Sequence, residues 1–582
     1  VWTLTDGKTI NFGTGSGGLD LAGDTFGGKI RGFIKNIVGD ENQKADIKVG
    51  GVTADRDLDI YTGAGKLTVG GAVTVSPSRR LTLGSKNAIE GTGVLTADRL
   101  QLEADEAKVS LTGANLLGKL DGNAKEMVFK NGANLTIGED VGFATTTGGA
   151  DIDVTGDLTV GAYGFRYNAG ALKLKASGTL HVNAGVEAVG AAAASLEAAS
   201  VNFGTGGNVS TAGGTLNVKT DALTLPSGAQ GTLSSANGKV TVETKTSGKT
   251  MSVAVSGSPA ADIALASLDF IDSGTGAVQL GNADTGNIEI GTTPVKAPLS
   301  VVSHDTIKVT GAVTNTNNKD ITFTGNKVNF DAASSLAAGA GKTKIVADEV
   351  QLKNGTFSGT GVFAVQKKTA GNFDVGGTST FLSDASIGKL AAGNFYNVAI
   401  GAKDNAGTAT IGEITALPQY TSILTNGALS LTGTVHGGTV HGGTANTLAL
   451  HGTGLTQTTT AGFAIGKLLL LGKGDMKIDS QHNKIENIAA DLTDTGSLTL
   501  TNKKDMNVAM IENRNVDPKK DVEGIEAKST HIKLDAGKKL NVAEKIKTKE
   551  NATLVADDMN LGNKVNVGKK LTLEKATKAQ TI

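Results

Sequence analysis

Short apolar–polar–apolar triplets recur along almost the whole chain, and they constrain its fold more than any other feature. Three of them start six residues apart near the end, at residues 559–561, 565–567 and 571–573, and the first two are followed by glycine. Because alternate side chains of a strand face opposite ways, each triplet turns two apolar residues inward and one polar residue outward. Such short strands, each followed by a corner, predict a chain that winds as a solenoid.

Comparable triplets begin near residue 65 and continue to the end, with no helical pattern of similar length, which predicts an all-β chain. Triplets that start at 152 and 172, at 158 and 180, and at 180 and 201 lie 20, 22 and 21 residues apart. A strict hexapeptide helix would keep a step of six throughout, which this chain does only around 559–571. A looser period near twenty residues predicts a long right-handed parallel β-helix with three short faces per coil.

Composition agrees with a long, narrow core. Among 582 residues, 81 are glycine, 7 are proline and only 4% are aromatic, which suits many corners and small inward side chains. Cysteine is absent, so disulfides and thiolate metal sites are excluded. The formal net charge of −1 provides no overall field that would attract nucleic acid, and no apolar run approaches the ~20 residues that span a bilayer.

Three parts are expected along the chain. Residues 1–50 are the least regular and carry the single tryptophan, so they are predicted to form an N-terminal cap or the end of a trimmed upstream domain. Residues 51–465 are predicted to form the charge-poor part of the β-helix, with an irregular excursion near 256–300. Residues 466–582 are predicted to continue the β-helix with a denser mixed charge, from 21 basic and 17 acidic side chains.

An Ala-Asp pair precedes a triplet at three distant places, residues 97–102, 347–352 and 556–561. The separations of 250 and 209 residues lie close to whole numbers of 21-residue coils, which predicts the same position in each coil. An aspartate there suits a corner, where its carboxylate can accept backbone N–H groups.

Histidines form the first group of side chains that could carry chemistry. His436 and His441 lie in a repeated Val-His-Gly-Gly-Thr sequence, and His451 follows closely, so three imidazoles could hold zinc or copper. No carboxylate lies between Glu413 and Asp475 to complete such a site. The preferred interpretation is a glycine-rich corner with exposed histidines.

Paired carboxylates form the second group, because a glycoside hydrolase needs two of them at a set separation. Coil stacking could bring such a pair together from Asp55/Asp57, Asp105/Glu106 or Asp151/Asp153. Aromatic platforms for sugars are scarce, however, with five tyrosines and one tryptophan. No catalytic, cofactor-binding or metal-binding residue is therefore assigned, and no cofactor is expected.

The triplets at 158–161 and 172–174, and the longer runs at 178–185 and 536–543, resemble the degenerate repeats of filamentous-haemagglutinin-like exoproteins. That resemblance implies a right-handed β-helix secreted by bacteria through a two-partner pathway and used as an adhesin or matrix fibre. The Asn-Pro-Asn-Gly signature of that family's secretion domain is absent here. The chain, which begins at Val1, is therefore expected to be an internal or mature piece, or to belong to another surface-fibre family such as autotransporter passengers.

We therefore expect a non-enzymatic, secreted or cell-surface structural protein that acts as a bacterial fibre, adhesin or extracellular matrix component. Its partners would be a host-cell, surface or polysaccharide ligand, and further copies of itself in a head-to-tail filament if the end coils are open. The alternative is an extracellular polysaccharide lyase or glycoside hydrolase on the same scaffold. Neither a nucleic-acid partner nor a transmembrane segment is expected.

Overall fold

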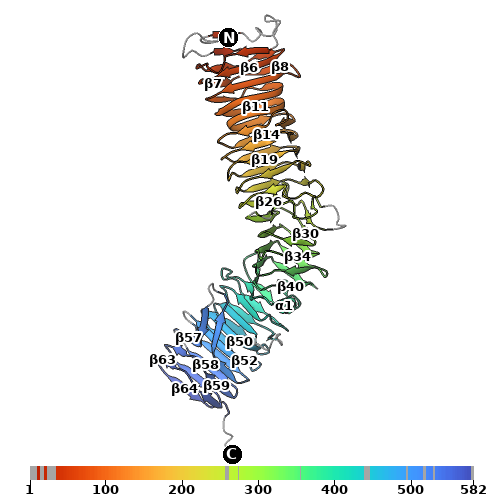
Figure 1. Cartoon of the computed structure of the whole chain (residues 1–582). Coiled ribbons are helices and arrows are strands. Elements are labelled where there is room, and N and C mark those ends of the chain that lie inside the picture. The colour runs from red at the N-terminus through yellow and green to blue at the C-terminus, as the bar shows by residue number, and fades with distance from the viewer. Residues whose placement is uncertain are drawn as a thin grey trace, which may run out of the picture. The chain divides into compact units, whose positions relative to one another are not determined.

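The computed structural model describes residues 10–12, 19–21, 35–255, 261–272, 274, 276–353, 355–437, 446–492, 496–515, 520–528 and 531–577. These residues form a parallel β-solenoid of about 23 turns with roughly 22 residues per turn, so the predicted all-β parallel β-helix is confirmed. The chain divides into two compact units, Val1–Ser252 with Ser258–Thr285, and Val253–Gly257 with Gly286–Ile582. Figure 1 shows the strands of each unit stacked as successive rungs.

Strand register in the first unit gives the length of a coil directly. In one face, Leu135 of β12 (Leu135–Ile137) pairs with Leu158 of β15 (Leu158–Val160), which pairs with Leu180 of β18 (Thr179–Val182). These steps are 23 and 22 residues. The 20-residue step between the triplets at 152 and 172 is not a ladder step, because Ile152 pairs with Leu174. The coils are therefore slightly longer than the sequence pattern predicts.

Strand β11 (Leu95–Asn131) departs from the pattern of short strands, because its 37 residues run without interruption through the corners of more than one coil. It pairs in parallel with earlier strands on one side and later strands on the other. These partners are β8 (Val73–Val75), β9 (Arg80–Ser85), β10 (Ala88–Gly91), β12, β13 (Phe143–Thr145) and β14 (Ala150–Val154). The wall is therefore continuous here, and the groove described below crosses it.

The second unit contains both the most regular triplets and the one helix of the described ranges, α1 (Asp384–Ala391). The triplets near 559–573 form β62 (Asp558–Asn560), β63 (Val565–Val567) and β64 (Leu571–Glu574). They pair with β59 (Lys539–Val542), β60 (Ile546–Thr548) and β61 (Ala552–Val555) in turn. Three successive triplets thus occupy three successive faces of one coil, as predicted.

Aspartates at the corners tie one coil to the next. Asp348 accepts hydrogen bonds from the backbone N of Thr369 at 2.9 Å and from its hydroxyl at 2.7 Å. Asp557 binds Thr577 in the same two ways, at 2.7 and 2.5 Å. The donors follow one coil later, 21 and 20 residues along the chain. The corner role predicted for the Ala-Asp pairs is confirmed at these two positions.

The predicted parts of the chain contain more regular structure than expected. Within residues 1–50, β1 (Ile10–Phe12) and β4 (Ile47–Val49) pair in parallel with each other, while residues 1–9, 13–18 and 22–34 lie outside the described ranges. Within 256–300, β30 (Ile288–Ile290), β31 (Thr293–Val295) and β32 (Leu299–Val302) take regular places in the ladders. The alanine-rich stretch near 190 forms β20 (Ala194–Glu197), where small side chains line the coil.

A hairpin interrupts the charge-dense C-terminal part, where the sequence predicts only further coils. Strands β55 (Met510–Asn513) and β56 (Lys520–Glu523) pair antiparallel and leave the parallel ladders around them. They form a two-stranded sheet of their own. This arm is visible in blue beside β50 (Gly462–Gly472) and β52 (Lys484–Leu492) in Figure 1.

Candidate functional site

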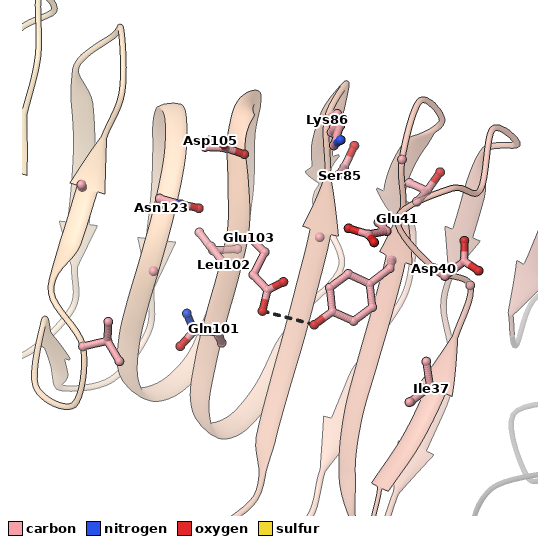
Figure 2. A pocket seen from close by; sticks show the side chains of 18 of the residues that line it. Ile37, Asp40, Glu41, Ser85, Lys86, Gln101, Leu102, Glu103, Asp105 and Asn123 are labelled. Carbon is pink, nitrogen blue, oxygen red and sulfur yellow. Dashed lines mark hydrogen bonds between the residues drawn. The ribbon is translucent and has the colours of Figure 1, made fainter.

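A groove of about 810 Å³ opens on the outer wall of the first unit, across coils that contain residues 37 to 144. β3 (Lys35–Val38), β6 (Asp57–Thr62), β9 and β11 supply much of its lining, together with the corners that follow them. Figure 2 shows acidic side chains around the opening on both sides. The carboxylates that line it are Asp40, Glu41, Glu103 and Asp105, and the cationic side chain is Lys86.

Tyr61 forms the centre of the groove. It pairs in register with Gly84 on the next coil, and a Cβ atom on Gly84 would stand only 2.3 Å from the ring. Glycine therefore lets the ring lie across the wall, and the tyrosine hydroxyl donates to Glu103 two coils away at 3.2 Å. Burial, together with the negative charges of Glu103 and Asp59, raises the pKa of Tyr61, so it remains a neutral donor.

A second glycine repeats this arrangement one position away. Gly122 has a φ of +105°, and a Cβ atom there would stand 2.8 Å from the side-chain amide nitrogen of Gln101. The amide of Gln101 thus lies over the following coil much as the Tyr61 ring does. Two outward side chains lie flat because glycine follows one coil later, and this hollows the wall.

The groove carboxylates differ from the acids buried beside them. Asp121 is fully buried, and Arg99 holds it with Nε 3.0 Å from a carboxylate oxygen. Burial raises the pKa of Asp121 despite that pairing. In contrast, no ion pair within the described residues reaches the four groove carboxylates named above. Asp121 therefore supports the wall, whereas the groove carboxylates face solvent.

The groove offers acceptors with apolar edges. Ile37 and Val141 line it and are 46% and 52% exposed. Four carboxylates against one lysine favour hydroxyl-rich or cationic ligands and disfavour an acidic polysaccharide, since like charges repel. The described residues contain no group of three histidine, aspartate, glutamate or cysteine side chains arranged to hold a metal ion.

The carboxylate pairs considered from the sequence are separated by the structure. Asp105 lines the groove, whereas Glu106 lines a neighbouring hollow of about 710 Å³ together with Lys86 and Lys125. Asp57 accepts the backbone N of Arg80 at 3.0 Å, which is a corner contact. Asp151 lies 3.6 Å from the amine of Lys173 on the next coil. Only Asp105 among the residues considered from the sequence therefore belongs to the groove.

Asp153 belongs to a column of alternating charge on the outer wall. In register order along the coils, the column contains Lys130, Asp153, Lys175, Glu197, Lys219 and Glu243. Each acid thus lies between two bases, or between a base and the end of the column. Such pairs stabilise neighbouring strands by roughly 0.2–1 kcal/mol each relative to alanine pairs. The column is a register device rather than a site.

The histidines are only partly described. His436 ends β47 (Thr434–His436) and is exposed, while His451 lies on β48 (Thr447–Gly452) with Nδ1 3.3 Å from the carbonyl of Thr425. Burial lowers the pKa of His451, so it is neutral near pH 7. His441 lies outside the described residues. His451 thus contacts backbone on a strand, whereas the prediction placed all three histidines at an exposed corner.

Sequence reasoning missed Tyr61, Glu41 and Glu103. A signal was present, because Gly84 follows Tyr61 by 23 residues and Glu103 follows Gly84 by a further 19. An aromatic residue with glycine one coil later and an acid one coil beyond indicates a side chain that lies along the wall.

Comparisons with known proteins add no relative, since no family model, no curated protein and no solved structure matches this chain. None of the helices in the described ranges is long and apolar enough to cross a membrane. The functional argument therefore rests on the scaffold and its groove.

Proposed function

We propose that this chain is a secreted or cell-surface structural protein, a bacterial fibre, adhesin or extracellular matrix component that presents a ligand-binding groove on a β-helix scaffold. The groove centred on Tyr61 carries this proposal, because its carboxylates have no cationic partner in the described residues while the neighbouring wall charges do. A structural scaffold needs no such hollow for its own folding. The groove is therefore the best candidate contact for an external ligand.

End-to-end association is part of the proposal. Strands β62, β63 and β64 pair on one side, and Leu561, Leu571 and Leu573 are 39%, 39% and 52% exposed. Their inward side chains and backbone edge would be covered by a further coil, either of the same polypeptide or of a second copy. An unpaired edge of this kind is a template for strand addition.

Two measurements test the proposal. A panel of immobilised neutral, amino-substituted and acidic glycans and of cationic peptides would be screened with the intact chain, with the variants Tyr61→Ala and Glu103→Gln, and with the wall control Asp153→Asn. We expect binding that both groove variants weaken and the control preserves. Binding by no member of the panel, or equal binding by all variants, would remove the groove from the proposal, and negative-stain images would report end-to-end rods independently.

A glycoside hydrolase remains the second candidate, because the groove places Glu41, Glu103 and Asp105 around an aromatic ring. The acidic lining favours a neutral glycan over the acidic substrates of lyases. Hydrolysis requires one carboxyl group to protonate the leaving oxygen while another acts as base or nucleophile. Release of reducing sugar that Glu41→Gln and Glu103→Gln abolish would establish this candidate and overturn the non-enzymatic proposal.

A further inference from the structure

The arm formed by residues 510–523 lies against the outer wall of the second unit, over coils that precede it in the chain. Ile511 on β55 is only 2% exposed and packs against outward-facing residues of the wall. Val522, its antiparallel partner on β56, packs beside it. We propose that this arm is a strap that joins several coils into one cooperatively unfolding block.

The wall beneath the arm is apolar where a solenoid wall is normally polar. Ser422, Ala449, Leu469 and Ala489 follow one another in register at an outward position of β45 (Tyr420–Leu424), β48, β50 and β52. All four are 0% exposed. Leucine is not buried at an outward position unless something covers it, and the arm is the element that packs there.

The far end of the arm is fastened by Arg514. Its guanidinium lies 4.5 Å from the ring centre of Tyr396 and 5.0 Å from that of Tyr420, and Nη1 donates to the carbonyl of Tyr396 at 2.6 Å. Cation–π contacts of this kind strengthen when they are shielded from water. Two of the five tyrosines of the chain therefore hold one arginine.

Tyr420 also joins the arm backbone directly to the wall. Its hydroxyl donates to the carbonyl of Glu512 at 2.9 Å and accepts from the backbone N of Arg514 at 3.0 Å. Asn397 adds a side-chain hydrogen bond to Asn515 at 3.2 Å. These contacts join residues 92 to 118 positions apart, whereas ladder partners are about one coil apart.

That sequence separation gives the strap its effect. In a solenoid each coil contacts only its neighbours, so coils can open one after another at modest cost. The arm leaves the chain after β54 (Met506–Val508) and reaches back to Asn397, so the intervening coils cannot open singly without losing arm contacts. Opening any coil of residues 397–508 then requires opening the block.

The strap is also separable from the ladders. Its two strands pair only with each other, and a lone two-stranded hairpin is marginally stable in water, so docking on the wall is what orders it. At its return, Gly524 has a φ of +69°, and a Cβ atom there would stand 2.0 Å from the carbonyl oxygen of Lys545. Detachment breaks no ladder hydrogen bond of the strands beneath it.

Native-state hydrogen exchange of the intact chain, read by mass spectrometry, tests the strap whatever the groove binds. The variants are Arg514→Ala, Tyr420→Phe and replacement of residues 510–523 by a glycine–serine linker, and the control is Arg166→Ala on the wall of the first unit. We expect amides of β43 (Asn397–Gly401), β45 and β48 to exchange roughly ten-fold faster in Arg514→Ala and less so in Tyr420→Phe.

The location of the change decides the result. Faster exchange confined to the strands beneath the arm supports the strap, with β14 and β20 of the first unit unchanged. Unchanged protection of β43, β45 and β48 in both point variants would overturn it. Equal loss of protection in both units would also overturn it, because it would show general unfolding rather than uncoupling of one block.

Discussion

The same outward position of the solenoid wall has opposite chemistry in the two units. In the first unit it carries the alternating column that includes Asp153, Lys175 and Glu197. In the second unit it carries Ala449, Leu469 and Ala489, all fully buried. The inward triplet residues are alike in both units. The difference shows that the inward pattern specifies the coil, whereas the outward pattern specifies what meets the wall.

Each outward pattern has its own mechanism of stabilisation. Charged columns keep neighbouring coils in register while water covers them, and each pair contributes little. The apolar column contributes only if it is covered, and it then gains from burial of about 25 cal/mol per Å². Substitutions at the covered column should therefore cost much more than substitutions at the open column.

The largest effect is expected for Leu469→Asp. A carboxylate at this fully buried position would be left without a cation beneath the arm, so we expect a loss of about 3–5 kcal/mol in the unfolding free energy of the second unit. Urea unfolding followed by circular dichroism measures it. Ser195→Asp, at an open wall position beside Lys173, is the matched control and should change stability little. Equal losses in the two variants would contradict the comparison.

The next effect concerns the acid buried beneath the first unit's wall. Arg99→Met would remove the guanidinium that lies 3.0 Å from Asp121 and leave a buried carboxylate without its cation. Because burial already raises the pKa of Asp121, part of the penalty would be relieved by proton uptake, and we expect a loss of about 2–3 kcal/mol at pH 7. The double variant Arg99→Met with Asp121→Asn should recover much of that loss. No recovery would show that Arg99 acts through packing alone.

Much of the fold was predictable because the triplets are a local signal. Each strand turns two apolar residues inward, so strand type, coil length and the corner aspartates follow from short stretches of sequence. The covered column was also present in the sequence, as apolar runs at 447–450, 467–471 and 487–490 that start twenty residues apart. Strands buried on both faces have continuous apolar runs of this kind.

What the sequence could not provide is contact between residues far apart in the chain. The arm rests on pairs such as Tyr420 with Glu512, and nothing in residues 510–523 indicates which wall they meet. The groove depends on Tyr61 and Glu103, which lie two coils apart and become neighbours only when the register is fixed. The three carboxylate pairs chosen from sequence adjacency missed it, because side chains adjacent along a strand face opposite ways.

A smaller effect is expected in the charged column. Lys175→Glu would place a third acid between Asp153 and Glu197, so the attraction on both sides becomes repulsion. These side chains are solvated, and we expect a loss of about 1 kcal/mol that falls as salt is added. Thermal melting at low and high ionic strength measures it, with Lys175→Ala as the neutral control. A loss that salt does not change would show that the column acts through packing rather than charge.

The smallest effect is a pH dependence that comes from single exposed carboxylates. Asp262 accepts from Lys249 Nζ and from the backbone N of Thr250, each at 2.8 Å, and these hydrogen bonds, that from Lys249 first, lower the pKa of Asp262 to about 2. Its unfolded value is about 3.9, so the ionised form stabilises the first unit above pH ~4. That stabilisation is lost as the pH falls from about 4 through about 2. Melting between pH 5 and 2 should therefore decline less steeply in Asp262→Asn, and Lys249→Ala should move the decline to higher pH. An unchanged pH profile in both variants would show that this contact contributes nothing to folding and that the open wall of the first unit depends on its register columns alone.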